Sequence, residues 1–155
     1  MTSLPRIQKA GYIPIAMGGQ DWQETLLFDH VALGAGGAQY FRELLDGNMD
    51  TIDSDDTTRV FSAMRALEPY TDAGKAGRSW GDTNNLVISG KAAYFFMGDW
   101  AKGGFLQAKK NPGKDFSCEI SPGSGMVLTA VDGFAFPKTS SSRDQATQGS
   151  LASAM

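Results

Sequence analysis

Residues 90–101 read Gly90-Lys91-Ala92-Ala93-Tyr94-Phe95-Phe96-Met97-Gly98-Asp99-Trp100-Ala101, and this stretch decides the fold class. The apolar run Ala92–Met97 predicts a buried strand. Gly98-Asp99 predicts a turn, and the Asp99 side chain is a suitable N-cap for a following helix with Phe105 and Leu106 on its inner face. A strand, a turn and a helix in this order are typical of an α/β protein.

A second strand and turn of the same kind lie near the N-terminus. Tyr12, Ile13 and Ile15 stand between glycines and predict a short strand over residues 11–16. A glycine-rich loop follows, and Asp21 then has the position of an N-cap, with Glu24 three residues later as in a capping box. We expect a helix from there to Gly47, interrupted by the glycines at 34–37.

The rest of the chain continues the alternation of helices and strands. A helix is predicted over residues 53–68, with Asp53 or Ser54 as its cap, and a shorter one from Asp82 to Gly90. Residues 116–120 and 126–136 are predicted strands, and a last helix develops within residues 140–155. The predicted fold class is therefore α/β and helix-rich, with a small sheet covered by helices.

The composition excludes several functional classes. The 155 residues include 14 Lys and Arg and 17 Asp and Glu without a basic stripe, so nucleic acid is not an expected partner. No apolar run reaches the roughly 20 residues that span a bilayer. The single Cys118 and single His30 provide no disulfide and no zinc site. A P-loop, a G-x-S-x-G elbow and an H-E-x-x-H motif are all missing, so we predict no cofactor, no metal and no catalytic residue.

Two strand-to-helix turns carry the candidate binding residues. The first contains Gln20 and Trp22, and the second contains Asp99 and Trp100. Ligands of open α/β sheets collect at the carboxyl ends of strands, where such turns lie. A Trp face suits the apolar C–H face of a sugar, and amide or carboxylate groups suit its hydroxyls. The alternative is that each turn is an ordinary capped helix start. Lys138 follows a predicted strand and either reaches the same crevice or is a solvated loop residue.

Four blocks of this sequence resemble a known family. Residues 90–101 are similar to the G-K-A-A-x-x-x-x-G-x-W signature of extracellular solute-binding proteins of the sugar ABC transporter class. Residues 13–23 resemble the loop before the long helix in the glucose/mannose-binding branch of that family, known as solute-binding protein family 1. Residues 112–116 and 132–138 match in order, although Asp132-Gly133 stands where relatives often have Asp-Ser.

The resemblance implies a fold, a ligand and a transport partner. The family has two α/β lobes of the periplasmic-binding-protein fold, type II-like, which close on a sugar. It implies that Gln20, Trp22, Asp99, Trp100 and Lys138 contact a monosaccharide such as glucose. It also implies that the intact parent protein is periplasmic and delivers the sugar to the membrane permease of an ABC importer, without being an enzyme. The residues at the N-terminus of this chain show no signal-peptide pattern.

The resemblance also bears on domain organisation. We interpret residues 1–155 as a single incomplete, C-terminal-type lobe, and residues 1–6 as a junction with foreign sequence. A truncated lobe is expected to bind sugar weakly or not at all, because half of the contacts are missing. We further expect the fragment to self-associate as a homodimer by exchanging an element. Two alternatives stay open, namely a carbohydrate-active hydrolase domain and a folded fragment that binds nothing.

Overall fold

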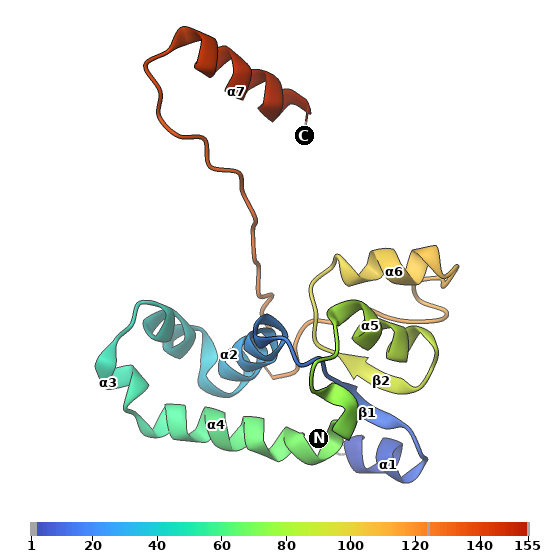
Figure 1. The fold of residues 1–155 in the computed structure, drawn as a ribbon. Coiled ribbons are helices and arrows are strands. Elements are labelled where there is room, and N and C mark those ends of the chain that lie inside the picture. The colour runs from blue at the N-terminus through green and yellow to red at the C-terminus, as the bar shows by residue number, and fades with distance from the viewer. Residues whose placement is uncertain (1–2, 124, 155) are drawn as a thin grey trace.

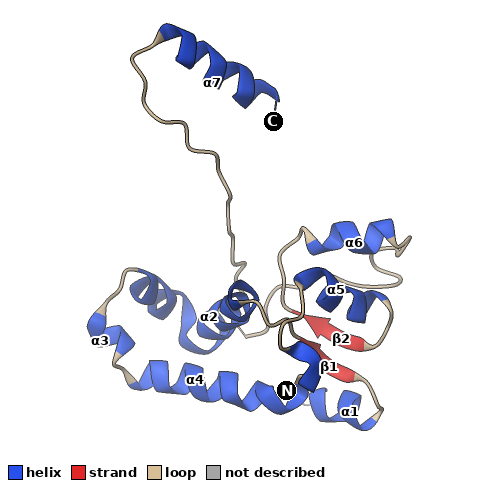
Figure 2. Cartoon of the chain, in the orientation of Figure 1, coloured by secondary structure: helices blue, strands red, loops and turns tan. Residues whose placement is uncertain are grey.

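Two parallel strands form the sheet of this protein. The computed structural model describes residues 3–123 and 125–154 (Figures 1 and 2). Strand β1 (Ile13–Ala16) pairs with β2 (Ala92–Phe95), with Ile13 opposite Ala92 and Ile15 opposite Tyr94. Both strands were expected from the apolar runs between glycines. Because parallel strands need a crossover, the long stretch between them holds most of the helices.

Helices and 3₁₀ turns make up the rest of the regular structure. Helix α1 packs against β1, and α5 packs against both strands. The long α2 and α4 pack side by side (Figure 1). The bounds are α1 Leu4–Lys9, α2 Asp21–Leu45, α3 Met49–Ile52, α4 Asp55–Leu67, η1 Glu68–Tyr70, η2 Ala73–Lys75, α5 Trp80–Ile88, α6 Ala101–Gln107 and α7 Ser142–Ala154. No helix within these described residues is both long and apolar enough to span a bilayer.

Helix α2 starts one residue earlier than the sequence indicated. Gln20, with extended backbone, is its N-cap, and Asp21 is its first helical residue. The prediction of Asp21 as a cap was wrong, but its carboxylate still lies at the positive end of the helix dipole. The expected interruption at the glycines is confirmed, because Gly37 has φ 86° and kinks the helix.

Serine residues cap both α4 and α5. The Ser54 hydroxyl accepts a hydrogen bond from Thr57 N at 3.3 Å, which confirms one of the two predicted caps of α4. Helix α5 is capped by Ser79, which accepts from Asp82 N at 3.2 Å and donates to the Asp82 carboxylate at 2.6 Å. Asp82 was therefore wrongly predicted as the cap, since it is the residue whose backbone N–H and carboxylate both bond to the Ser79 hydroxyl.

Asp99 is not a cap either. Trp100 takes the N-cap position of α6, and no side chain caps this helix. Backbone bonds from Lys102 N to Asp99 O and from Gly103 N to Trp100 O, at 3.0 and 3.1 Å, satisfy its first N–H groups in a tight turn. On the helix, Phe105 is buried as expected, whereas Leu106 is 51% exposed.

The two strands predicted late in the chain are not formed. Within the described part of residues 117–141 there is no strand, and this segment pairs with neither β1 nor β2. Met126 and Leu128 pack against the core, but Val131 is 86% exposed and Phe134 is 77% exposed. The predicted last helix, α7, is confirmed and lies apart from the other elements (Figure 1).

Helix α2 joins two apolar clusters into one core. The first lies between the sheet and the helices and contains Leu4, Ile15, Met17, Leu27 and Leu67. The second lies between α2 and α4 and contains Ala32, Leu33, Tyr40, Phe41 and Val60. Because α2 contributes to both clusters, its N-terminus is held firmly beside the end of β1.

Candidate functional site

A groove lies where the two strand-to-helix turns meet. Since β1 and β2 are parallel neighbours, their carboxyl ends share one edge of the sheet, and α2 and α6 begin just beyond it. The groove has a volume of about 450 Å³. Its lining residues are Trp22, Thr25, Leu26, Trp100, Ala130 and Asp132. The structure thus brings the tryptophans of both turns to one cavity.

The first turns of α2 form one wall of the groove. Trp22, Thr25 and Leu26 are spaced three and four residues apart, which places them on one face of a helix. The Thr25 hydroxyl donates to Asp21 O at 3.0 Å, which fixes its rotamer. Trp22 remains 39% exposed and Trp100 43% exposed, so both indoles offer free surface to a ligand.

A glycine sets the orientation of Trp100. A Cβ built on Gly98 would overlap the Trp100 indole ring, so the ring folds back over the glycine backbone. Any larger residue at position 98 would push the indole away. The Gly98-Asp99-Trp100 turn therefore needs glycine because the indole occupies the space of a Cβ.

The turn after β1 is held by the loop that precedes α5. Gly19 N donates to Arg78 O at 3.1 Å, and a Cβ on Gly19 would lie 2.6 Å from Lys75 O. The Arg78 guanidinium donates to Met17 O at 3.0 Å and forms a two-pronged pair with Asp72. This pairing holds the pKa of the Asp72 carboxyl below its ordinary value. The Arg78–Asp72 pair thus fixes the turn that leads into α2, whose first turn carries Trp22.

Gln20 has a structural role in this turn. Its side-chain oxygen accepts from Gln23 Nε2 at 2.9 Å and from Trp80 N at 3.1 Å, so it ties α2 to the first residue of α5. Gln20 does not line the groove. Of the five residues predicted to contact sugar, only Trp22 and Trp100 line it. Asp99 and Lys138 are exposed and lie outside its lining.

The segment after Pro122 completes the groove from the other side. Pro122 and Gly123 lie close to Gly34, since a Cβ on Gly34 would be 2.9 Å from Pro122 O. From there the chain runs back along α2, with Met126 and Leu128 on the core, and brings Ala130 and Asp132 to Trp22. Sequence reasoning missed Thr25, Leu26, Ala130 and Asp132 as lining residues. Helical spacing from Trp22 points to the first two, and no local pattern points to the others.

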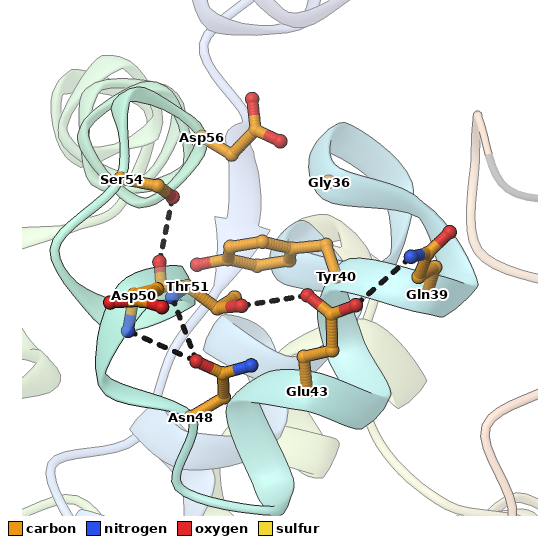
Figure 3. A pocket seen from close by; sticks show the side chains of 9 residues that line it. All are labelled: Gly36, Gln39, Tyr40, Glu43, Asn48, Asp50, Thr51, Ser54 and Asp56. Carbon is orange, nitrogen blue, oxygen red and sulfur yellow. Dashed lines mark hydrogen bonds between the residues drawn. The ribbon is translucent and has the colours of Figure 1, made fainter.

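A second hollow of about 490 Å³ lies at the other end of α2 (Figure 3). Its polar groups are engaged with one another: Glu43 accepts from Thr51 Oγ1 at 2.7 Å and from Gln39 Nε2 at 2.9 Å. These hydrogen bonds hold the pKa of Glu43 below its ordinary value. The Tyr40 hydroxyl bonds to Thr57 Oγ1 at 2.9 Å. We interpret this hollow as the polar joint between α2, α3 and α4.

The described residues bring together no group of three or more His, Cys, Asp or Glu side chains that could hold a metal ion. The chemistry of the groove is therefore that of two indoles, one hydroxyl and one carboxylate. Such a set stacks on an apolar face and hydrogen-bonds to hydroxyl groups.

Several sequence relatives of this chain are described as probable sugar-binding periplasmic proteins. A probable sugar-binding periplasmic protein of Brucella suis biovar 1 is 42% identical over 138 residues, which is 88% of this chain and 33% of that protein. A probable sugar-binding periplasmic protein of Mesorhizobium japonicum is 39% identical over 153 residues, covering 97% of this chain and 36% of that protein. This chain spans about a third of the length of these relatives.

Solved structures share the fold. The bacterial solute receptor AcbH, which has an exclusive substrate preference for β-D-galactopyranose, aligns with a TM-score of 0.61 at 25% identity over 66% of this chain and 26% of the receptor. A protein of xylan utilization in Caldanaerobius polysaccharolyticus aligns with a TM-score of 0.62 at 24% identity over 80% of this chain and 30% of that one, which supports the fold alone.

The predicted fold class is confirmed by these likenesses. The chain is helix-rich α/β with a small parallel sheet, as in one lobe of the two-lobed binding-protein fold. The sequence profile described as bacterial extracellular solute-binding protein matches residues 3–148, so the chain belongs to that family.

Proposed function

We propose that this chain binds a monosaccharide weakly, in the groove between Trp22 and Trp100. The observation that carries the proposal is the meeting of two half-exposed indoles, from turns 78 positions apart in sequence, in one cavity at the strand ends. A volume of about 450 Å³ is in the usual range for small-molecule sites. One indole stacks on the C–H face of the sugar ring, and the second packs against the edge of the same ring.

The hydroxyl groups of the sugar need polar partners in the groove. Asp132 supplies a carboxylate that accepts hydrogen bonds, and Thr25 supplies a hydroxyl. Gln20, Asp99 and Lys138 do not line the groove in this structure. We keep them as proposed ligand residues, and direct contact with a sugar requires their segments to move.

The transport role follows from the family and from the names of the relatives. We propose that the parent protein is a non-enzymatic, periplasmic carrier that delivers sugar to the permease of an ABC importer. Relatives described as probable sugar-binding periplasmic proteins support this. Glucose is the proposed ligand from the resemblance to the glucose/mannose branch, and galactose is the competitor that AcbH suggests.

A hydrolase is less well supported. Glycoside hydrolysis commonly uses two carboxyl groups about 5–5.5 or 6.5–9.5 Å apart. Of the residues lining the groove, Asp132 alone is acidic. Incubation with aryl glycosides tests this alternative, because turnover that disappears in Asp132→Asn would favour it.

We also propose that the chain self-associates at high concentration. Val127, Val131 and Phe134 are 70%, 86% and 77% exposed on a segment without strand partners. Apolar side chains on an unpaired extended segment favour exchange with a second copy. Light scattering across a range of concentrations tests this, and a monomer throughout would contradict it.

Binding is measured by titration calorimetry together with tryptophan fluorescence, using glucose, galactose, mannose and maltose. We expect saturable binding of a monosaccharide that is lost in Trp22→Ala and in Trp100→Ala. Trp80→Phe is the matched control, because Trp80 is 36% exposed but does not line the groove. Heat and fluorescence that stay unchanged with every sugar would contradict sugar binding by this chain.

A further inference from the structure

The groove carries a net negative charge. Its six lining residues include one acid, Asp132, and no Lys, Arg or His. Among the described residues no hydrogen bond and no ion pair engages the Asp132 carboxylate, which is exposed. No basic side chain among the lining residues therefore pairs with the Asp132 carboxylate, and the partial positive charges of the α2 and α6 N-termini are the groups that oppose its charge.

Charged residues of both signs are close in sequence to the lining but are not part of it. Asp21 precedes Trp22 and Asp99 precedes Trp100, whereas Lys102 lies on α6 and Lys138 on the extended segment. None of these four side chains lines the groove. Asp132 is therefore the one charged residue among the lining residues.

We propose that this groove selects sugars by charge, and that Asp132 is the residue that sets the selection. It accepts neutral and cationic pyranoses and rejects anionic ones, namely uronic acids and sugar phosphates. This inference rests on the proposed sugar-binding function and adds a substrate class to it.

The physical basis is the cost of placing two like charges in contact. A carboxylate of the ligand within about 5 Å of Asp132 meets a repulsion of roughly one to a few kcal/mol at the effective dielectric of a protein surface, or about tenfold or more in affinity. A neutral hydroxyl at the same place instead donates a hydrogen bond to a charged acceptor, which is among the stronger kinds. An ammonium group gains from the same charge.

The test compares glucose, glucuronate and glucosamine by titration calorimetry in one buffer at about pH 6, where the amine is protonated and the uronate is ionised. We expect glucuronate to bind at least about tenfold more weakly than glucose, and glucosamine at least as tightly as glucose. In Asp132→Asn the glucuronate penalty should fall to within about threefold. Asp46→Asn is the charge-matched control, because Asp46 is exposed at the far end of α2 and should keep the full penalty.

The outcomes separate this inference from the function on which it rests. Glucose binding with equal affinity for glucuronate would overturn charge selection and leave the sugar site intact. A penalty that persists in Asp132→Asn, in a variant with the circular dichroism of the wild type, would overturn the role of Asp132. Failure of the wild type to bind glucose, the other neutral sugars or glucosamine would refute the proposed function and this inference together.

Discussion

Arg78 does not line the groove, but its side chain holds the turn that leads into α2, so its loss should destabilise the groove. Its guanidinium donates to Met17 O at the end of β1 and pairs with Asp72, and its side chain is only 14% exposed. Its own carbonyl accepts from Gly19 N. Replacing Arg78 with Ala removes the side-chain bonds and leaves the backbone bond in place, so the effect reports on the guanidinium alone.

The expected loss can be worked from these contacts. Met17 is 8% exposed, so removing the donor leaves a largely buried carbonyl unsatisfied, at a cost of about 1–3 kcal/mol. The pair with Asp72, whose side chain is 22% exposed, lies between a surface ion pair and a buried one, and we assign it about 1–2 kcal/mol. The free energy of unfolding should therefore fall by about 2–5 kcal/mol in Arg78→Ala.

Urea denaturation followed by circular dichroism measures this loss. With a slope near 2 kcal/mol/M, the midpoint should move down by about 1–2.5 M. Arg78→Lys keeps the charge but loses the planar fork, so an intermediate loss is expected. A loss below about 1 kcal/mol in Arg78→Ala, or a wild-type midpoint in Arg78→Lys, would refute this reasoning.

The same pair predicts a pH dependence. Because Arg78 lowers the pKa of Asp72 in the folded state, the pair contributes stability above the ordinary aspartate pKa of about 3.9 and loses it as the pH falls through the lowered folded value. The gap between wild type and Arg78→Ala should therefore be wide at pH 7 and narrower near pH 3. Urea midpoints at both values check the sign.

Three further changes probe other parts of the structure. Gly19→Ala should cost about 2–4 kcal/mol, because its Cβ would press on the backbone of residues 75–77, and a urea midpoint equal to that of the wild type would contradict the close approach. Burial raises the pKa of Asp29, so ionisation of this carboxyl opposes folding as the pH rises. Asp29→Asn should therefore raise the stability of the folded protein by under about 1 kcal/mol at pH 7 and leave it unchanged near pH 3. Thermal melts at the two pH values measure the difference. Tyr40→Phe removes the bond to Thr57 and should cost about 1 kcal/mol in the same melts, with Tyr70→Phe as control.

Sequence patterns succeeded where the signal was local. The apolar runs at β1 and β2 are bounded by glycine, and Gly90 has φ 71°, which closes α5 as expected. Ser54 caps α4 because its side chain competes well for the first N–H groups. These features depend on a few adjacent residues, so a single sequence contains what is needed.

The patterns failed where the outcome depends on distant partners. An apolar stretch such as residues 126–136 becomes a strand only if another strand pairs with it, and here it pairs with neither β1 nor β2. Asp132 reaches the groove because Pro122 and Gly123 dock on Gly34, a contact that spacing does not reveal. Gln20 was correctly placed in the turn, but its oxygen is already engaged by Gln23 and Trp80.

The pairing of β1 with β2 has a consequence for how this chain is made. Ile13 and its partner Ala92 are 79 positions apart, so β1 has no ladder until β2 has been synthesised. At about 5–20 residues per second, β1 therefore waits roughly 4–16 s during synthesis before its partner strand exists. Helices α2 and α4 lie wholly between the strands and pack on each other, so they can collapse first and shorten the loop that the sheet must close. The groove, which needs both strand ends, is then the last feature to form.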